Sequence, residues 1–231
     1  MMKKTALLVA ILLLAGAVTA QDMIGTLPAF GRTYTGNTRG FYCQAPVDFF
    51  VQGLRVPNES SKKFQYVALM RDLTAPPAFS ATTLLTPVFY ETSGTAPSAN
   101  IVPCKVLFKT GEHLIVIGGC ADAAGSVSNS YAGLSGGQPA MILGAATTLT
   151  RCGVQASIAT ATVGPYAMWS EASGPIARVE VYVTDLYLTG DKATPKAGET
   201  VTFAIEGVPG LANYSYYMAS SIGMGPFTIE G

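Results

Sequence analysis

The sequence predicts an all-β protein, in which a jelly-roll-like antiparallel β-sandwich is followed by a short C-terminal β appendage. Almost no stretch of the chain places apolar residues at a helical period, whereas several short runs alternate between apolar and polar residues. Turn-forming residues separate these runs, since the 231 residues include 25 glycines and 14 prolines. Many short strands with turn signals every ~8–12 residues are typical of sandwiches and barrels.

The first half of the chain holds several strand-like runs, each bounded by turn signals. Pro76 and Pro77 interrupt regular structure, and residues 93–100 form a predicted loop. A turn at Thr110–Glu112 joins the two arms of a predicted hairpin over residues 104–120. The other predicted strands of this half cover residues 40–43, 47–56, 64–71 and 87–91.

In the second half, residues 121–140 have few bulky apolar side chains and are predicted to form a long loop. Strands are predicted to resume at 141–143, 147–150 and 153–158. Residues 178–184 alternate cleanly, with three valines on one face, which indicates a half-buried strand. Further strands are predicted over residues 201–206, 213–218 and 226–229.

These signals divide the chain into five parts. Residues 1–20 are a predicted signal peptide, 21–38 a lead-in, and 39–186 the β-sandwich domain. Residues 187–198 are mostly polar and are predicted to be a linker. The C-terminal β segment, 199–231, is small for an independent domain, so it either docks on the sandwich or belongs to a longer C-terminal part.

The N-terminus has the layout of a secretory signal peptide. Lys3 and Lys4 precede an apolar run from Ala6 to Ala17, and the small residues 18–20 offer a cleavage site before Gln21. The alternative is an uncleaved anchor, but the run is shorter than the ~20 residues that span a bilayer. We therefore expect a secreted or cell-surface protein with no membrane span in the mature chain.

The four cysteines fit an oxidising compartment, because their number is even and no CxxC pair suggests a metal site. In the predicted hairpin, position 108 faces 116, so Cys104 faces Cys120 and the two sulfurs leave the same face. The sequence therefore predicts a Cys104–Cys120 disulfide, which leaves Cys43–Cys152 as a long-range disulfide.

Composition excludes several classes of function. Lys and Arg total 14, as do Asp and Glu, so no basic excess favours nucleic acid. One histidine and the spacing of the cysteines argue against a zinc site. A structural Ca²⁺ is possible in the loops but not favoured, because no DxDxDG spacing occurs. Its candidate oxygen ligands are Asp122, Asn129, Asp185 and Asp191.

Four segments resemble a known group of proteins: residues 39–42, 47–57 (VDFFVQGLRVP), 109–118 (KTGEHLIVIG) and 178–182 (RVEVY). They are similar to uncharacterised secreted bacterial, planctomycete-type domains with a jelly-roll-like β-sandwich, and the match covers roughly residues 33–185. The resemblance implies an exported, non-catalytic module. It supplies no catalytic residues, and the four cysteines depart from it.

Aromatic residues in polar surroundings are the candidate binding site. Tyr166, Trp169 and Tyr131 lie outside the alternating runs, and with Glu171 they could stack on and bind a sugar. We call this set the predicted aromatic platform. The alternative, which the sequence favours, is that Trp169 is buried and plugs one end of the sandwich.

Candidate catalytic groups are sparse. His113, the only histidine, is expected to be an exposed residue of the hairpin turn, and no GxSxG motif supports a serine hydrolase. No recognisable pair stands out among the carboxylates that a glycoside hydrolase could use, which include Asp72, Glu91, Glu112, Asp122, Glu171, Glu180 and Asp185.

The sequence therefore favours a secreted, non-enzymatic module for binding or adhesion, whose partner is an extracellular glycan or protein. The first alternative is a structural subunit of an extracellular filament or envelope layer that self-assembles by strand addition. The second and least favoured alternative is a glycoside hydrolase.

Overall fold

The structure is a computed structural model that describes residues 22–25, 27–160, 163–190, 203–208 and 229–230. It divides into two compact units, one of residues 22–185 and the other containing the C-terminal strands from residue 186 onward. Every regular element of the described residues is a β-strand. The prediction of an all-β fold is therefore confirmed. The predicted signal peptide, residues 1–20, lies outside the described residues, as does the predicted strand at 213–218.

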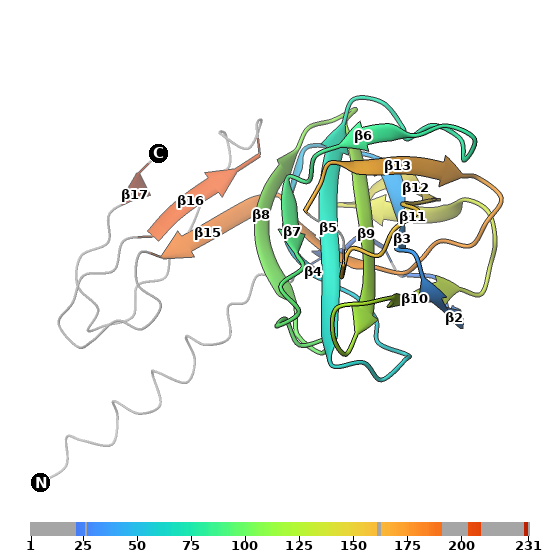
Figure 1. The fold of residues 1–231 in the computed structure, drawn as a ribbon. Coiled ribbons are helices and arrows are strands. Elements are labelled where there is room, and N and C mark those ends of the chain that lie inside the picture. The colour runs from blue at the N-terminus through green and yellow to red at the C-terminus, as the bar shows by residue number, and fades with distance from the viewer. Residues whose placement is uncertain (1–21, 26, 161–162, 191–202, 209–228, 231) are drawn as a thin grey trace, which may run out of the picture. The chain divides into compact units, whose positions relative to one another are not determined.

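The larger unit contains two sheets whose strands pair antiparallel (Figure 1). The smaller sheet has the order β1-β14-β4-β8. Its strands are β1 (Asp22–Met23), β14 (Glu180–Thr184), β4 (Phe49–Arg55) and β8 (Val102–Phe108).

The larger sheet has ten strands, and β9 lies between β3 and β5 in it. Its main path runs through β2 (Phe30–Gly36), β10 (Val127–Ala132), β9 (His113–Ala121), β3 (Arg39–Gln44), β12 (Ala145–Gly153), β13 (Tyr166–Glu171) and β6 (Thr83–Leu85). Three further strands branch from this path: β11 (Gln138–Ile142) on β12, β5 (Phe64–Asp72) on β9, and β7 (Phe89–Glu91) on β5.

The main core lies between the two sheets. Phe49, Val51 and Leu54 of β4 contribute to it from the smaller sheet, and Phe41 and Val116 do so from the larger sheet. Each fully buried side chain of this size stabilises the fold by about 1.5–3 kcal/mol relative to exposure. This arrangement is the predicted antiparallel β-sandwich. The jelly-roll-like connectivity stays a prediction.

A second apolar cluster covers the outer face of the larger sheet. Met70 of β5 and Ile115 of β9 pack there with Tyr166 and Met168 of β13. Figure 1 shows β13 and β6 running across the direction of β5 and β9. Because β5 and β9 are covered on both faces, they carry almost continuous apolar residues instead of alternating ones.

The C-terminal unit holds a three-stranded sheet of β15 (Leu186–Gly190), β16 (Phe203–Gly207) and β17 (Ile229–Glu230). β15 pairs antiparallel with β16, whereas β17 pairs parallel with it. The strand predicted at 201–206 is thus confirmed for its described part. The linker predicted at 187–198 is wrong for residues 187–190, which belong to β15, and its remainder lies outside the described residues.

The predicted lead-in and the predicted loop at 121–140 are also corrected. Residues 30–36 of the lead-in form β2, which pairs with β10, and residues 127–132 of the loop form β10 itself. β10 lacks large aliphatic residues apart from Val127, yet all six of its residues are buried. Its short polar side chains are satisfied locally, as when the Asn129 amide donates to the carbonyl oxygens of Tyr34 and Asn37, both at 3.0 Å.

The predicted hairpin at 104–120 is not formed, although both of its strands exist. β8 pairs with β4 in the smaller sheet, whereas β9 pairs with β3, β5 and β10 in the larger one. The Sγ of Cys104 lies against the carbonyl oxygen of Val51, and that of Cys120 against the carbonyl oxygen of Val56. Five residues of strand separate those carbonyls by roughly 16 Å, so the Cys104–Cys120 disulfide is wrong.

The predicted Cys43–Cys152 disulfide is wrong for a different reason. Cys43 points into the core between the sheets, whereas Cys152 belongs to the cluster on the outer face. All four cysteines are buried free thiols. Burial raises the pKa of Cys43, Cys104 and Cys120 to about 12, and it raises the pKa of Cys152 further still.

The number of free thiols can be measured directly. We expect a disulfide-exchange reagent to label no cysteine rapidly in the native protein, and to label all four in concentrated guanidinium chloride without added reductant. Thiol titration by absorbance and intact mass checks both numbers. Thiols that can be titrated only after reduction would contradict the structure and support the two disulfides predicted from the sequence.

Candidate functional site

The structure brings three residues of the predicted aromatic platform together around Arg151 of β12. The guanidinium of Arg151 lies 5.4 Å from the ring centre of Tyr131 and 5.7 Å from that of Trp169. Its Nη1 lies 3.1 Å from Oε2 of Glu171. Tyr166 lies apart from this group, since its ring belongs to the cluster on the outer face of the larger sheet.

The platform is nevertheless not exposed. Trp169 is 1% accessible, Tyr131 3% and Tyr166 4%, so none of these rings offers a face for stacking on a sugar. Phe79 packs edge-on against Trp169 at 4.8 Å, and Arg39 lies over its ring at the same distance. The prediction of a binding platform is therefore wrong, and the alternative of a buried Trp169 is confirmed.

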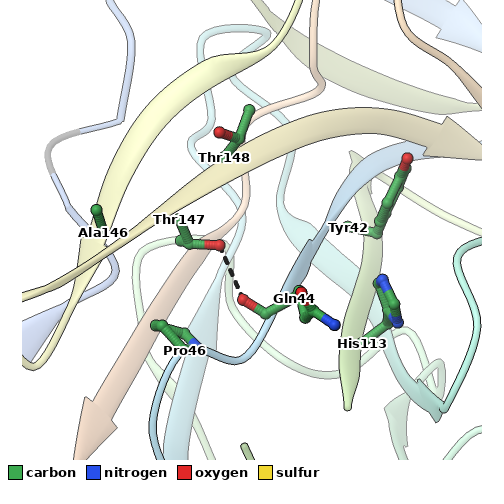
Figure 2. Close-up of a pocket in the computed structure, with 7 residues that line it drawn as sticks. All are labelled: Tyr42, Gln44, Pro46, His113, Ala146, Thr147 and Thr148. Carbon is green, nitrogen blue, oxygen red and sulfur yellow. Dashed lines mark hydrogen bonds between the residues drawn. The ribbon is translucent and has the colours of Figure 1, made fainter. Parts of the chain in front are cut away.

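A polar depression of about 340 Å³ lies instead on the outer face of the larger sheet, beside the second cluster. Figure 2 shows the rings of Tyr42 and His113 near each other, with the threonine side chains of β12 across from them. We call this site the Tyr42 pocket. It is lined by Tyr42, Gln44, Pro46, His113, Ala146, Thr147 and Thr148.

Comparison of the chain with protein-family models, curated proteins and solved structures found no match. The chemistry of the Tyr42 pocket therefore carries the functional argument.

Strand register places these side chains together. Tyr42 and Gln44 alternate with Phe41 and Cys43, which point into the main core, so the first two project from the outer face. His113 is directly opposite Gln44 on β9, and side chains of opposed residues share a face. His113 was expected to be an exposed turn residue, but it begins β9 and is half-buried.

The rim of the pocket is fixed by the loop of residues 109–112. Gln44 donates through Nε2 to the carbonyl oxygen of Gly111 at 3.2 Å, and the Gly111 amide donates to the Ala45 carbonyl at 2.9 Å. The Asp48 carboxylate accepts bonds from the Thr110 amide and hydroxyl, at 2.7 and 2.8 Å. The bond from the Thr110 amide is the main cause that lowers the pKa of Asp48. The pocket wall is thus organised before any ligand arrives.

One buried polar atom of the pocket has no hydrogen-bond partner within the described residues. His113 Nδ1 is buried without a hydrogen bond, and its ring is tilted against Tyr42 at a centroid distance of 6.0 Å. Thr147, by contrast, donates its hydroxyl to the Gln44 carbonyl at 2.8 Å. The pocket lining contains no Asp, Glu, Lys or Arg, so it offers neutral hydrogen-bonding groups beside an aromatic ring.

A second depression, of about 380 Å³, is built from ion pairs. Arg55 binds Glu180 through two nitrogens, with Nη2 2.8 Å from Oε1, and the Tyr182 hydroxyl donates to Glu180 at 2.9 Å. Arg178 pairs with Glu59 and donates to the Ser130 hydroxyl at 3.1 Å. The two carboxylates of this second depression, Glu59 and Glu180, are each paired with an arginine, so the depression carries no unbalanced charge.

The candidate calcium ligands are placed separately. Asp122 binds the Lys62 ammonium at 3.0 Å, and the Asn129 amide is used by backbone groups of the sheet. Asp185 is exposed at the end of the larger unit, and Asp191 lies outside the described residues. Among the described residues, no group of three or more His, Cys, Asp and Glu side chains could hold a metal ion. These residues also include no helix long and apolar enough to cross a membrane.

The sequence did not reveal the Tyr42 pocket because its residues resemble those of ordinary strands. Tyr42 and Gln44 fall in or beside a predicted strand, and nothing in the sequence shows that β12 lies beside β3. One signal was present. His113 is the first residue of β9, and the residues that follow it are mostly apolar. A polar side chain at this position indicates that the apolar residues covering that face of the sheet end there.

Proposed function

We propose that this chain is a secreted, non-enzymatic binding module that holds a neutral glycan in the Tyr42 pocket. The single observation that carries the proposal is the combination of an aromatic ring with neutral hydrogen-bonding groups in one depression. Sugars present apolar faces that pack on aromatic rings, and their hydroxyls bind to hydrogen-bond donors and acceptors placed beside such a ring. Export rests on the predicted signal peptide at residues 1–20.

Affinity electrophoresis in gels that contain hydroxyethylcellulose, xylan, galactomannan or laminarin tests the proposal. We expect at least one of these neutral polymers to retard the protein, and Tyr42→Ala to weaken that retardation at least tenfold. Apart from the imidazole of His113, the Tyr42 ring is the only aromatic ring among the seven lining residues, and the substitution removes it.

Two controls accompany this experiment. Tyr90→Ala removes an exposed tyrosine from β7, outside the pocket, and is expected to leave retardation unchanged. Thermal melting shows whether Tyr42→Ala is folded. If no neutral polymer retards the wild-type protein, or if Tyr42→Ala is retarded equally, the proposal is wrong.

One observation favours the alternative of a self-assembling structural subunit. Within the described residues, β2 pairs only with β10, so its other edge is unpaired over seven residues. Such an edge can accept a strand from a second copy. Size-exclusion chromatography at high protein concentration separates the two functions, because a strictly monomeric protein would remove the alternative.

A further inference from the structure

Strand register places a row of four polar side chains across four strands of the larger sheet, and three of the four line the Tyr42 pocket. Asp72 of β5 is directly opposite His113 of β9, and His113 is directly opposite Gln44 of β3. Thr148 of β12 lies two residues before Thr150, which is paired with Tyr42, and it lines the same pocket as Gln44. We call Asp72, His113, Gln44 and Thr148 the cross-strand row.

The next set of residues along these strands shows why the row is open. Met70 and Ile115 are opposed to each other, and Ile115 is opposed to Tyr42. Met70 and Ile115 are fully buried in the second cluster, whereas Tyr42 is only partly covered by it. The cover of the outer face therefore ends at Tyr42, and its ring forms a wall along the row.

The far end of the row is also uncovered. β7 pairs with β5 only at residues 67–69, so β5 is an edge strand at Asp72 within the described residues. The Asp72 carboxylate accepts bonds from the Leu73 amide at 2.7 Å and from the Thr74 hydroxyl at 3.4 Å. A carboxylate has about four lone-pair directions, so Asp72 can still accept hydroxyl donors from a ligand.

The spacing of the row matches an extended chain. Adjacent strands lie about 4.8 Å apart, so the four side chains span about 14 Å across the sheet. One strand spacing is close to the length of one ring in a fully extended pyranose chain. Each ring can therefore meet one side chain of the row, and the ring nearest Gln44 can pack its apolar face against Tyr42.

We propose that the cross-strand row binds a linear neutral oligosaccharide of about four rings, which lies perpendicular to the strands and can be an internal part of a longer polymer. This inference rests on the proposed function and adds the length, direction and class of the ligand. An isolated pocket would bind one or two rings and would gain nothing from a longer chain.

Calorimetric titration with oligosaccharides of one to six rings tests the inference, using the cello-, xylo-, manno- or laminari- series that corresponds to the retained polymer. We expect the Kd to fall at least tenfold from two rings to four, and to change less than twofold from four to six. A ligand of two rings that binds as tightly as one of four would overturn the inference but leave the proposed function intact. Failure of every neutral polymer in the gel is the separate outcome that removes the proposed function.

Variants at the two ends of the row give a second test. Asp72→Ala is expected to weaken binding of the four-ring ligand three- to tenfold and to leave the two-ring Kd within twofold. Thr148→Val alters the Tyr42 pocket itself, so it is expected to weaken binding of both ligands. The matched control is Thr82→Val, which removes an exposed hydroxyl outside the row and should change neither value. For Asp72→Ala, equal losses for the two-ring and four-ring ligands, or no loss for either, would overturn the inference.

Discussion

Replacing Arg39 by alanine is expected to lower the free energy of unfolding by about 3 kcal/mol or more. Arg39 is 5% accessible, and no carboxylate pairs with it among the described residues. Its Nη1 donates to the carbonyl oxygens of Thr38, at 3.1 Å, and Val154, and its Nη2 donates to Gln155 at 3.2 Å. The substitution leaves these acceptors without a donor and opens space beside Trp169.

The positive charge of Arg39 is compensated by carbonyl dipoles and by the faces of aromatic rings. Its guanidinium lies 4.8 Å from the ring centre of Trp169 and 5.6 Å from that of Tyr34. Burial is the main cause that lowers the pKa of Arg39, although an arginine stays charged at neutral pH. Arg39→Lys should also destabilise the protein, because an ammonium group lacks the planar fork that serves three acceptors at once.

Urea denaturation followed by tryptophan fluorescence measures both variants, because Trp169 lies against the substituted side chain. Arg32→Ala is the matched control, since exposed Arg32 only lies over the Tyr131 ring at 5.9 Å. We expect that control to cost less than about 1 kcal/mol. Equal stability of Arg39→Ala and Arg32→Ala would show that the buried contacts of Arg39 do not stabilise the larger sheet.

Gly40→Ala is expected to prevent folding or to cost more than about 4 kcal/mol. A Cβ at Gly40 would lie 1.8 Å from the Val116 carbonyl oxygen and 2.7 Å from the Cα of Ile117. Both atoms are backbone of the neighbouring strand β9, so no side chain can move aside to relieve the clash. The strands β3 and β9 would have to separate at the centre of the larger sheet.

Soluble yield, circular dichroism and urea denaturation check this result. Gly133→Ala is the control, because the nearest atom to a Cβ there is 3.6 Å away, which is ordinary contact. A Gly40→Ala protein that folds with wild-type stability would mean that β3 and β9 are not neighbours in the register described here.

The sequence predicted strand positions better than strand partners. The strand expected at 64–71 is β5 over Phe64–Asp72, and the one expected at 178–184 contains β14. Alternation and turn residues act locally, so they mark strands. Pairing depends on contacts between distant segments, and β8 and β9 illustrate the difference because a clear turn joins them although they enter different sheets.

The sequence also did not show which polar and aromatic residues are buried. The residues of β10 are small and polar, which predicted a loop, but backbone bonds and the Asn129 amide satisfy them inside the sheet. Trp169 has Gly-rich neighbours in the sequence, yet two arginines and Phe79 cover its ring. The Tyr42 pocket needed three strands, β3, β9 and β12, to be placed side by side, and only the structure supplies that order.

The most direct test of the account is an NMR titration of isotope-labelled protein with the four-ring oligosaccharide of the retained series. We expect the amide signals of Gln44, His113, Asp72 and Thr148 to shift together, while the indole signal of Trp169 stays unchanged. Shifts that centre on Trp169 and Arg151, or no shifts in the cross-strand row at saturating oligosaccharide, would contradict the account.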